Sequence, residues 1–163
     1  MKSIVLIGMM GSGKSTLGKL LAQQLGLAFI DIDSVIEKKE QMSVSEIFAQ
    51  KSEAYFREVE KSTILSVFKP ENLVISLGGG AFENSETRDY LLQNAKVIYL
   101  KTTPQTIFER IKNDNSRPLL YGKMSVEHIS DIINKRKTNY ESAHLTVETD
   151  NKTPAKIIRE ILK

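Results

Sequence analysis

The sequence predicts an α/β fold in which a parallel β-sheet is covered by helices on both faces. Short apolar segments rich in β-branched residues alternate with longer segments whose apolar residues recur at helical spacing. In addition, a glycine-rich turn at residues 8–15 joins the first apolar segment to the first helical segment. Such an alternation places successive strands in one sheet and packs the connecting helices against its faces.

Three strands are predicted in the first half of the chain. Residues 2–8 form an apolar, β-branched run typical of a buried parallel strand, and residues 16–25 form a helix with leucines at helical spacing. Further strands are predicted at residues 27–30 and 72–77. Between them, residues 32–40 and 43–68 are predicted to be helical, with a break at Gln41 and Met42.

The second half continues the alternation. A helix is predicted at residues 83–94, a strand at 96–100, and a helix at 104–113, where Pro104 suits the first helical turn. Residues 112–123 are polar and interrupt the pattern with Asn113, Pro118 and Gly122. The chain then ends with a predicted helix at 125–141, a strand at 144–147 and a helix at 154–162.

Composition indicates one domain spanning residues 1–163. Apolar residues make up 40% of the chain and charged residues 26%, as is usual for a globular protein. The net charge of +3 is dispersed, without a basic stripe interleaved with aromatics, so no nucleic-acid partner is expected. The absence of cysteine excludes disulfides and thiolate metal sites. No apolar segment approaches the ~20 residues of a membrane span and no secretory leader is recognisable, so a cytoplasmic protein without a membrane partner is expected.

Residues 8–15 match the phosphate-binding pattern G-x-x-x-x-G-K-[ST]. Its glycines let successive backbone N–H groups point inward, and the following helix directs its positive end at the same place. Lys14 is expected to contact the β- and γ-phosphates, and the Ser15 hydroxyl is placed to ligate Mg²⁺. A ligand-free glycine turn would not require Lys14 and Ser15 after its last glycine. The pattern therefore predicts binding of a nucleoside triphosphate.

Asp31 and Asp33 follow the second predicted strand, at the sheet edge where ligands of parallel sheets collect. In extended chain, residues two apart point to one side, so both carboxylates are expected to face one cleft. One would lie near the water shell of the metal and the other near an acceptor hydroxyl. The alternative is that Asp33 or Ser34 merely caps the next helix.

Three glycines, residues 78–80, follow the third predicted strand. Many phosphate-loop proteins have a Mg²⁺-binding carboxylate at this place. Because none follows this strand, Asp31 is the best candidate for the metal-side carboxylate. The glycines would let a substrate approach the backbone and could offer N–H donors to an anion. A simple turn would need only one or two of them.

Arginines are the remaining candidates for binding an anionic group. Arg57 is flanked by aromatics on a helix entering the core, where an arginine usually has an anionic partner. Arg117 lies in the polar segment 112–123, which is predicted to be a lid that closes over the γ-phosphate. Each of the four arginines considered would more often be a solvated surface charge when taken alone: Arg57, Arg110, Arg117 and Arg136.

Taken together and in order, these motifs resemble the shikimate kinase family over essentially the whole chain. The motifs that carry the resemblance are residues 8–16, Asp31 with Asp33, residues 56–58, residues 78–80, residues 117–120, and Arg136 followed by Tyr140 and Glu141. The resemblance implies a phosphate-loop three-layer sandwich that is similar to nucleoside monophosphate kinases, with a five-stranded parallel sheet and a lid. It also implies transfer of the γ-phosphoryl group of ATP to the 3-hydroxyl of shikimate, in the pathway to chorismate and the aromatic amino acids.

The same resemblance implies roles for individual residues. Asp33 would bind the acceptor hydroxyl and act as its base or orienter, while Lys14 and Arg117 would stabilise the transferring phosphoryl group. Ser15 would ligate Mg²⁺, with Asp31 in its outer shell. Shikimate would be held by Arg57, Arg136 and the backbone at Gly79 and Gly80. ATP would be bound by Gly11, Ser12, Gly13, Lys14, Ser15, Thr16 and Arg117, with Arg110 and Pro154 flanking the adenine. A monomer that acts on small molecules is implied.

Four other functions remain to be weighed. Gluconate kinase shares the loop and an acidic substrate, but the triple glycine and Arg117-Pro118-Leu119-Leu120 favour shikimate. Nothing here resembles the base-reading segment of a nucleoside monophosphate kinase. A GTP-dependent switch would require Asn-Lys-x-Asp, which the sequence beginning at Asn151 lacks. A catalytically silent nucleotide sensor could lose Asp33 or Arg117, and both are present.

Overall fold

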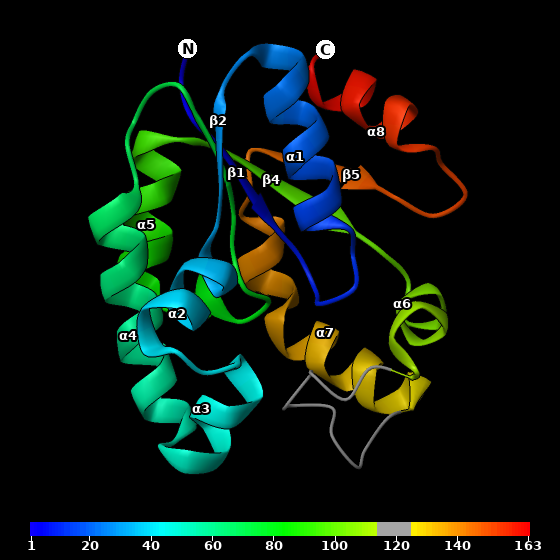
Figure 1. Ribbon diagram of the computed structural model, residues 1–163. Helices are drawn as coiled ribbons and strands as arrows, with labels where there is room; N and C mark the ends of the chain where they lie inside the picture. The colour runs from blue at the N-terminus through cyan, green and yellow to red at the C-terminus, as the bar shows by residue number, and fades with distance from the viewer. Residues whose placement is uncertain (114–124) are drawn as a thin grey trace.

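A computed structural model describes residues 1–113 and 125–163, and its centre is one five-stranded sheet (Figure 1). The strand order is β2-β3-β1-β4-β5, and every neighbouring pair is parallel. The predicted α/β fold with a parallel sheet is therefore confirmed. The strands are β1 (Ile4–Ile7), β2 (Ala28–Asp31), β3 (Leu73–Ser76), β4 (Lys96–Lys101) and β5 (Leu145–Glu148).

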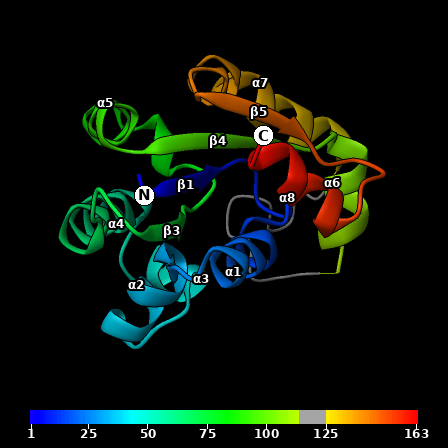
Figure 2. The ribbon, with the colours of Figure 1, turned by 90° about the horizontal axis from the view of Figure 1, so that it is seen from above.

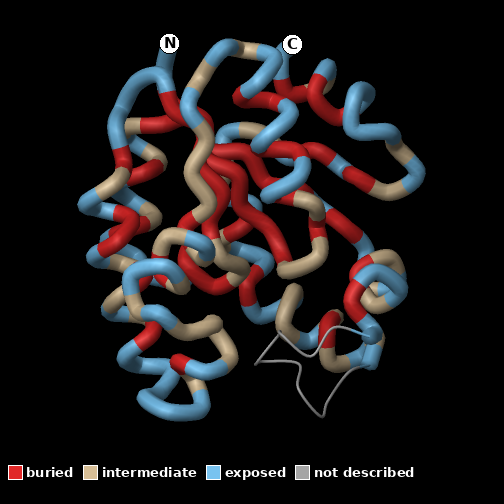
Figure 3. Tube along the Cα trace, in the orientation of Figure 1, coloured by how far each residue is buried: buried red, intermediate tan, exposed pale blue. Residues whose placement is uncertain are grey.

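Helices cover both faces of the sheet, because alternate residues of each strand point to opposite sides. In β1, Ile4 and Leu6 pack into the cluster formed with α1 and α8, whereas Val5 and Ile7 pack into the cluster formed with α4, α5 and α7. Figure 2 shows the strands between these two groups, and Figure 3 shows the buried strands at the centre. These helices are α1 (Lys14–Leu25), α8 (Pro154–Ile161), α4 (Glu53–Val67), α5 (Ser85–Asn94) and α7 (Val126–Glu141).

The helix predicted over residues 43–68 is wrong as a single element. It is divided into α3 (Val44–Gln50) and α4, which begins at Glu53 after a break at Lys51 and Ser52. The Ser52 hydroxyl accepts a hydrogen bond from the Tyr55 backbone N–H at 3.0 Å and so caps α4. Hydroxyl side chains favour such caps because they satisfy a helix N–H that has no carbonyl partner. The predicted break at Gln41 is confirmed, because α2 (Ile32–Glu40) ends there with φ at 54°.

The other differences are at element ends. Residues 81–83 form the short 3₁₀ helix η1 (Ala81–Glu83), and Asn84 then caps α5, so the helix predicted from residue 83 begins at Ser85. Helix α6 (Pro104–Ile111) ends two residues before the predicted end. Residues 114–124, most of the predicted lid, lie outside the described residues. Among the helices that are described, none combines the length and apolar character needed to cross a membrane.

Candidate active site

A cavity of about 730 Å³ opens at the carboxyl ends of the strands, where the phosphate loop, the start of α2 and the triple glycine meet. Segments from residue 10 to residue 157 line it, so the fold brings together residues from both ends of the chain. Most of the predicted site residues that the structure describes line this cavity: Gly11, Ser12, Gly13, Lys14, Ser15, Thr16, Asp31, Asp33, Arg57, Gly79, Gly80, Arg110 and Pro154.

The phosphate loop is wrapped around the ammonium group of Lys14. The Lys14 Nζ donates to the backbone carbonyls of Gly8 and Met9, both at 2.9 Å. At Gly8 the chain has φ of 148°, and a Cβ there would lie 2.6 Å from the Leu100 carbonyl oxygen, so only glycine fits. Helix α1 starts at Lys14 itself, which places the buried ammonium group at the positive end of the helix. The loop therefore concentrates positive charge and N–H groups at one end of the cavity.

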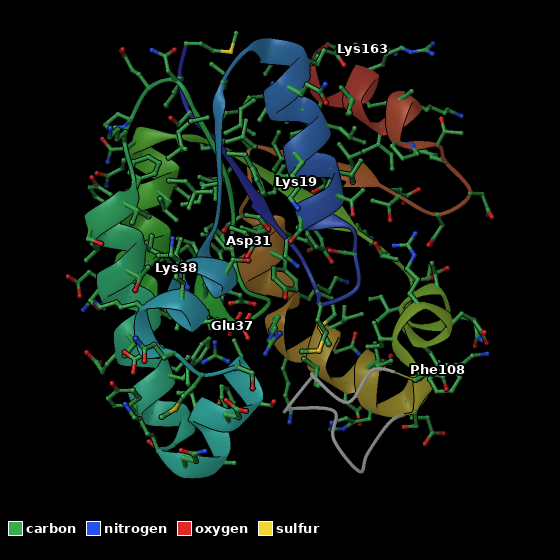
Figure 4. All side chains as sticks on the ribbon, viewed as in Figure 1. Lys19, Asp31, Glu37, Lys38, Phe108 and Lys163 are labelled. Atoms are coloured by element: carbon green, nitrogen blue, oxygen red, sulfur yellow. The ribbon has the colours of Figure 1, made fainter. Side chains whose placement is uncertain are left out.

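Asp31 ends β2 and caps α2, beside the start of α1 (Figure 4). One of its carboxylate oxygens accepts a hydrogen bond from the Ser15 hydroxyl. The other accepts from the Ser34 backbone N–H at 3.2 Å. The alternative that Asp33 or Ser34 caps this helix is wrong, because Asp31 is the capping residue. The carboxylate of Asp31 and the hydroxyl of Ser15 thus form one oxygen-rich pair next to the phosphate loop.

Asp33 lines the cavity, but a helix positions it there rather than the extended chain that was predicted. The expectation that Asp31 and Asp33 share one side of extended chain is wrong, because Asp33 already lies in the first turn of α2. Nevertheless both residues line the same cavity. The Asp33 Oδ1 atom lies 2.9 Å from the position that a Cβ on Gly78 would occupy. Asp33 therefore lies against the first residue of the triple glycine, in the cavity that the phosphate loop also lines.

The three consecutive glycines each leave room for a charged side chain. A Cβ on Gly78 would lie within 3.0 Å of carboxylate oxygens of Asp33 and Glu60. A Cβ on Gly79 would be 3.2 Å from the Arg136 Nη1, and one on Gly80 only 2.5 Å from the Arg57 Nη2. Hence all three positions, rather than the one or two of a simple turn, are used to bring charged groups close to the backbone.

Arg57 has the anionic partner that was predicted for it. Its Nη1 donates to Glu60 Oε1 at 2.9 Å, and its Nη2 lies 3.5 Å from Glu53 Oε1. The guanidinium also lies 5.3 Å from the ring centroid of Phe56, which is buried. Glu60 was not among the predicted site residues. The spacing of three between Arg57 and Glu60, which places them on one helix face, is the signal that could have identified it.

Arg136 lies close to Gly79 but is not among the residues lining the larger cavity. It is buried on α7 and lines an adjoining cavity of about 340 Å³. Arg57, Glu60 and Gly80 line both cavities. The two predicted carboxylate-binding arginines therefore both line the smaller cavity, next to the triple glycine.

Arg110 and Pro154, the two residues predicted to flank a nucleobase, also line the larger cavity. The Arg110 Nη1 donates to the Gly11 carbonyl oxygen at 2.9 Å, so this exposed side chain is tied to the phosphate loop. Arg117 lies outside the described residues, and its predicted position over the γ-phosphate stays a prediction.

Glu60 is a buried carboxyl group with an unusual pKa. Its Oε2 atom has no hydrogen-bond partner among the residues described, and its side chain is only 3% exposed. Burial raises the pKa of Glu60 from 4.5 to about 7, which the Arg57 guanidinium opposes. The neighbouring Asp33 carboxylate is a smaller cause of the same rise. The folded protein therefore holds a proton at Glu60 more tightly than the unfolded chain does.

This difference predicts a stability that falls with rising pH. The contribution of Glu60 is fully present below pH 4.5 and is lost as the pH rises through 7, because the unfolded chain releases the proton first. The loss amounts to about 3–4 kcal/mol of unfolding free energy if each pKa unit is worth about 1.4 kcal/mol. In Glu60→Gln this part of the slope should be absent when urea unfolding is measured between pH 4.5 and 8.

Glu58→Gln is the matched control, since Glu58 is an exposed carboxylate on the same helix. It should keep the pH dependence of the parent protein. Equal slopes in the parent and Glu60→Gln would contradict the burial of an ionisable group at this position.

Comparisons with known proteins agree with this geometry over the full chain. A model of the shikimate kinase family matches residues 10–163. The shikimate kinase of Persephonella marina is 46% identical over 162 residues, covering 99% of this chain and 98% of that protein. The shikimate kinase of a Sulfurihydrogenibium species is 44% identical, covering 99% of this chain and 96% of that protein.

A solved structure shows the same architecture. The shikimate kinase from Acinetobacter baumannii in complex with shikimate superimposes with a TM-score of 0.95 at 33% identity, covering 99% of this chain and 91% of that chain. The predicted phosphate-loop fold, similar to that of nucleoside monophosphate kinases, is thereby confirmed. The full-length match of sequence and fold, together with a cavity that joins a phosphate loop to paired carboxylates and arginines, shows that this chain belongs to the shikimate kinase family.

Proposed function

We propose that the chain carries out the reaction of its family, the ATP-dependent phosphorylation of shikimate at its 3-hydroxyl group, within the cavity described above. The protein is an enzyme of the shikimate pathway to the aromatic amino acids, as its family membership indicates. The observation that carries the assignment of roles is the position of Asp33. It lines the same cavity as the phosphate loop and Arg57, so donor and acceptor groups can meet beside its carboxylate.

The donor end is assigned to ATP. The loop residues Gly11, Ser12, Gly13 and Thr16 supply the phosphate cradle, and Lys14 supplies a fixed positive charge for the β- and γ-phosphates. Arg110 and Pro154 line the same cavity and are assigned to the adenine on the family resemblance. Arg117 is assigned to the transferring phosphoryl group on the family resemblance alone.

The acceptor end is assigned to shikimate. Planar guanidinium groups bind a carboxylate through two parallel hydrogen bonds, which suits Arg57 and Arg136 to an anionic acid. Gly79 and Gly80 offer backbone N–H groups beside them. The shikimate-bound structure of the Acinetobacter relative supports the same substrate for this fold. Asp33 is then the group that accepts or orients the proton of the attacking hydroxyl.

The residues near the phosphate loop fit a magnesium ion. Mg²⁺ takes few protein ligands and keeps waters and substrate phosphates, so a hydroxyl and one carboxylate suffice. Ser15 would contact the ion directly, and Asp31 would bind its outer shell, which agrees with the existing hydrogen bond between these two side chains. When bound, the ion would neutralise charge on the phosphates during transfer. The positions of the Ser15 hydroxyl and the Asp31 carboxylate would determine where the ion binds.

Several further properties are proposed on the family resemblance and composition. The chain would act as a single-domain monomer, residues 1–163, in the cytoplasm. It would bind small molecules and neither nucleic acid nor a membrane.

A coupled ADP-release assay tests the proposed function. With Mg²⁺ and ATP, the protein should turn over shikimate and give only background rates with gluconate, AMP and CMP. Removal of Mg²⁺ with EDTA should abolish the shikimate-dependent rate, and added Mg²⁺ should restore it. Turnover with one of the other acceptors, and not with shikimate, would refute the assignment.

A further inference from the structure

Tyr140 on α7 is bonded to the backbone of the triple glycine. Its hydroxyl donates to the Gly79 carbonyl oxygen at 2.5 Å. The side chain is fully buried, and its ring stacks on the Tyr99 ring of β4 with centroids 4.8 Å apart. Burial raises the pKa of Tyr140 above its ordinary value, so the hydroxyl stays protonated and remains a donor.

This hydrogen bond also fixes the direction of the next N–H group. The carbonyl of Gly79 and the N–H of Gly80 belong to one planar trans peptide unit and point in opposite directions. When Tyr140 holds the carbonyl on the α7 side, the Gly80 N–H must point away from α7. Tyr140 thus determines the direction in which the Gly80 N–H points, although Tyr140 does not line either cavity.

The N–H of the buried residue Gly80 has no protein acceptor among the residues that the structure describes. Gly80 also lines both cavities. Buried backbone N–H groups are almost always bonded, so an open one in a cavity wall points to a ligand oxygen. Arg57 lies against the same glycine, which places this donor beside the proposed acceptor end.

Helix α7 supports the two sides of this peptide from one face. Arg136 and Tyr140 are four residues apart and therefore lie on the same side of the helix. The Arg136 Nη1 lies 3.2 Å from the position of a Cβ on Gly79, while the Tyr140 hydroxyl holds the carbonyl of the same residue. One rigid element thus sets both a guanidinium group and a backbone donor at the acceptor end.

We propose that Tyr140 is a positioning residue for the acceptor substrate, which it serves by aiming the Gly80 N–H at an oxygen of that substrate. This inference rests on the proposed function, because the oxygen is one of bound shikimate. Tyr140 touches neither the substrate nor the reacting atoms. Its contribution is the orientation of a donor that would otherwise rotate with its peptide plane.

Tyr140→Phe tests the proposal, since phenylalanine keeps the stacked ring and removes only the hydroxyl. The KM for shikimate should rise about tenfold, as expected when one buried carbonyl loses its donor and a ligand hydrogen bond is misaligned. The KM for ATP should not change, and kcat should stay within about threefold because the reacting groups are untouched. Tyr99→Phe is the matched control: within the described part of the chain the Tyr99 hydroxyl makes no hydrogen bond, and this variant should behave like the parent.

Amide NMR supplies a second measurement, and its first arm uses only the parent protein, so that arm does not depend on the variant folding. In the ¹⁵N-labelled parent, shikimate without nucleotide should shift the Gly80 amide resonance. In Tyr140→Phe that shift should be strongly reduced, whereas any shift of Gly79 should persist because its N–H belongs to the preceding peptide. The Gly79 resonance is therefore an internal control for binding itself.

The outcomes separate this inference from the proposed function. A parent protein that does not phosphorylate shikimate would refute the function, whatever Tyr140 does. A parent that is active, with Tyr140→Phe matching Tyr99→Phe in its KM for shikimate, would refute the role of Tyr140 alone. The same holds if shikimate binds to the active parent and leaves the Gly80 resonance unmoved.

Discussion

Asp33→Asn is expected to lower kcat for shikimate phosphorylation by about 10²–10⁴-fold, the range that a positioned general base contributes. Asparagine has nearly the same size and can still accept a hydrogen bond through its amide oxygen, but it cannot take up a proton. Asp33 lies against Gly78 and is not part of the phosphate loop, so ATP binding should be nearly unaffected. Steady-state kinetics with each substrate varied in turn measures both effects.

Asp31→Asn is the matched comparison, because it makes the same chemical change two residues earlier. Asp31 is bonded to Ser15 rather than placed at the triple glycine. Its replacement should raise the Mg²⁺ concentration required for activity, with a smaller effect on kcat at saturating Mg²⁺. If Asp33→Asn retained kcat within tenfold of the parent, Asp33 would have no part in proton transfer.

Gly80→Ala is expected to raise the KM for shikimate by about 10- to 100-fold, in keeping with the cost of disrupting a charge pair at a binding site. The new Cβ would stand 2.5 Å from the Arg57 Nη2 and 2.8 Å from its Cζ, so the guanidinium must leave its position. The backbone at Gly80 has φ of −102°, which alanine adopts without strain. Since the clash involves the end of a flexible side chain, the unfolding free energy should change by less than about 1 kcal/mol.

A double-mutant cycle isolates the mechanism of this effect. In an Arg57→Ala background the guanidinium is already absent, so Gly80→Ala should add less than about twofold to the KM for shikimate. A full additional loss in that background would show that alanine harms binding by another route. Isothermal titration with shikimate alone would distinguish a binding effect from one on turnover.

The fold was predictable because it depends on local patterns. The strand at Ile4–Ile7 and the leucines of α1 are visible as apolar periodicity, and the glycine pattern at residues 8–15 specifies a tight turn whatever surrounds it. The division between α3 and α4 was missed because apolar spacing continues through Lys51 and Ser52. There a single hydroxyl cap, rather than periodicity, decides where one helix stops and the next begins.

The role of a site residue was predictable where a local motif indicates it, as for Lys14 in the phosphate loop. It was less predictable where the residue acts together with partners from distant segments of the chain. Arg57 could be predicted to need an anion. That Glu60 is a partner of Arg57 is visible in their spacing of three on one helix. That burial beside Asp33 raises the Glu60 pKa depends instead on how closely α4 approaches Gly78. Similarly, the hydrogen bond of Tyr140 links residues 61 positions apart in the chain. No local pattern reports such a distance.

By itself, the sequence determined the strand-loop-helix that binds phosphate, the parallel α/β architecture and the residue types an acid kinase requires. Only the tertiary structure decided which partner each of those residues has. Asp31 caps a helix and bonds to Ser15, and Asp33 lies against Gly78. The three adjacent glycines let charged side chains approach the backbone. The physical reason is the distance along the chain over which each effect acts. Periodicity and turn chemistry act over a few neighbouring residues, whereas burial, charge pairing and close backbone approach depend on segments that meet only when the chain folds.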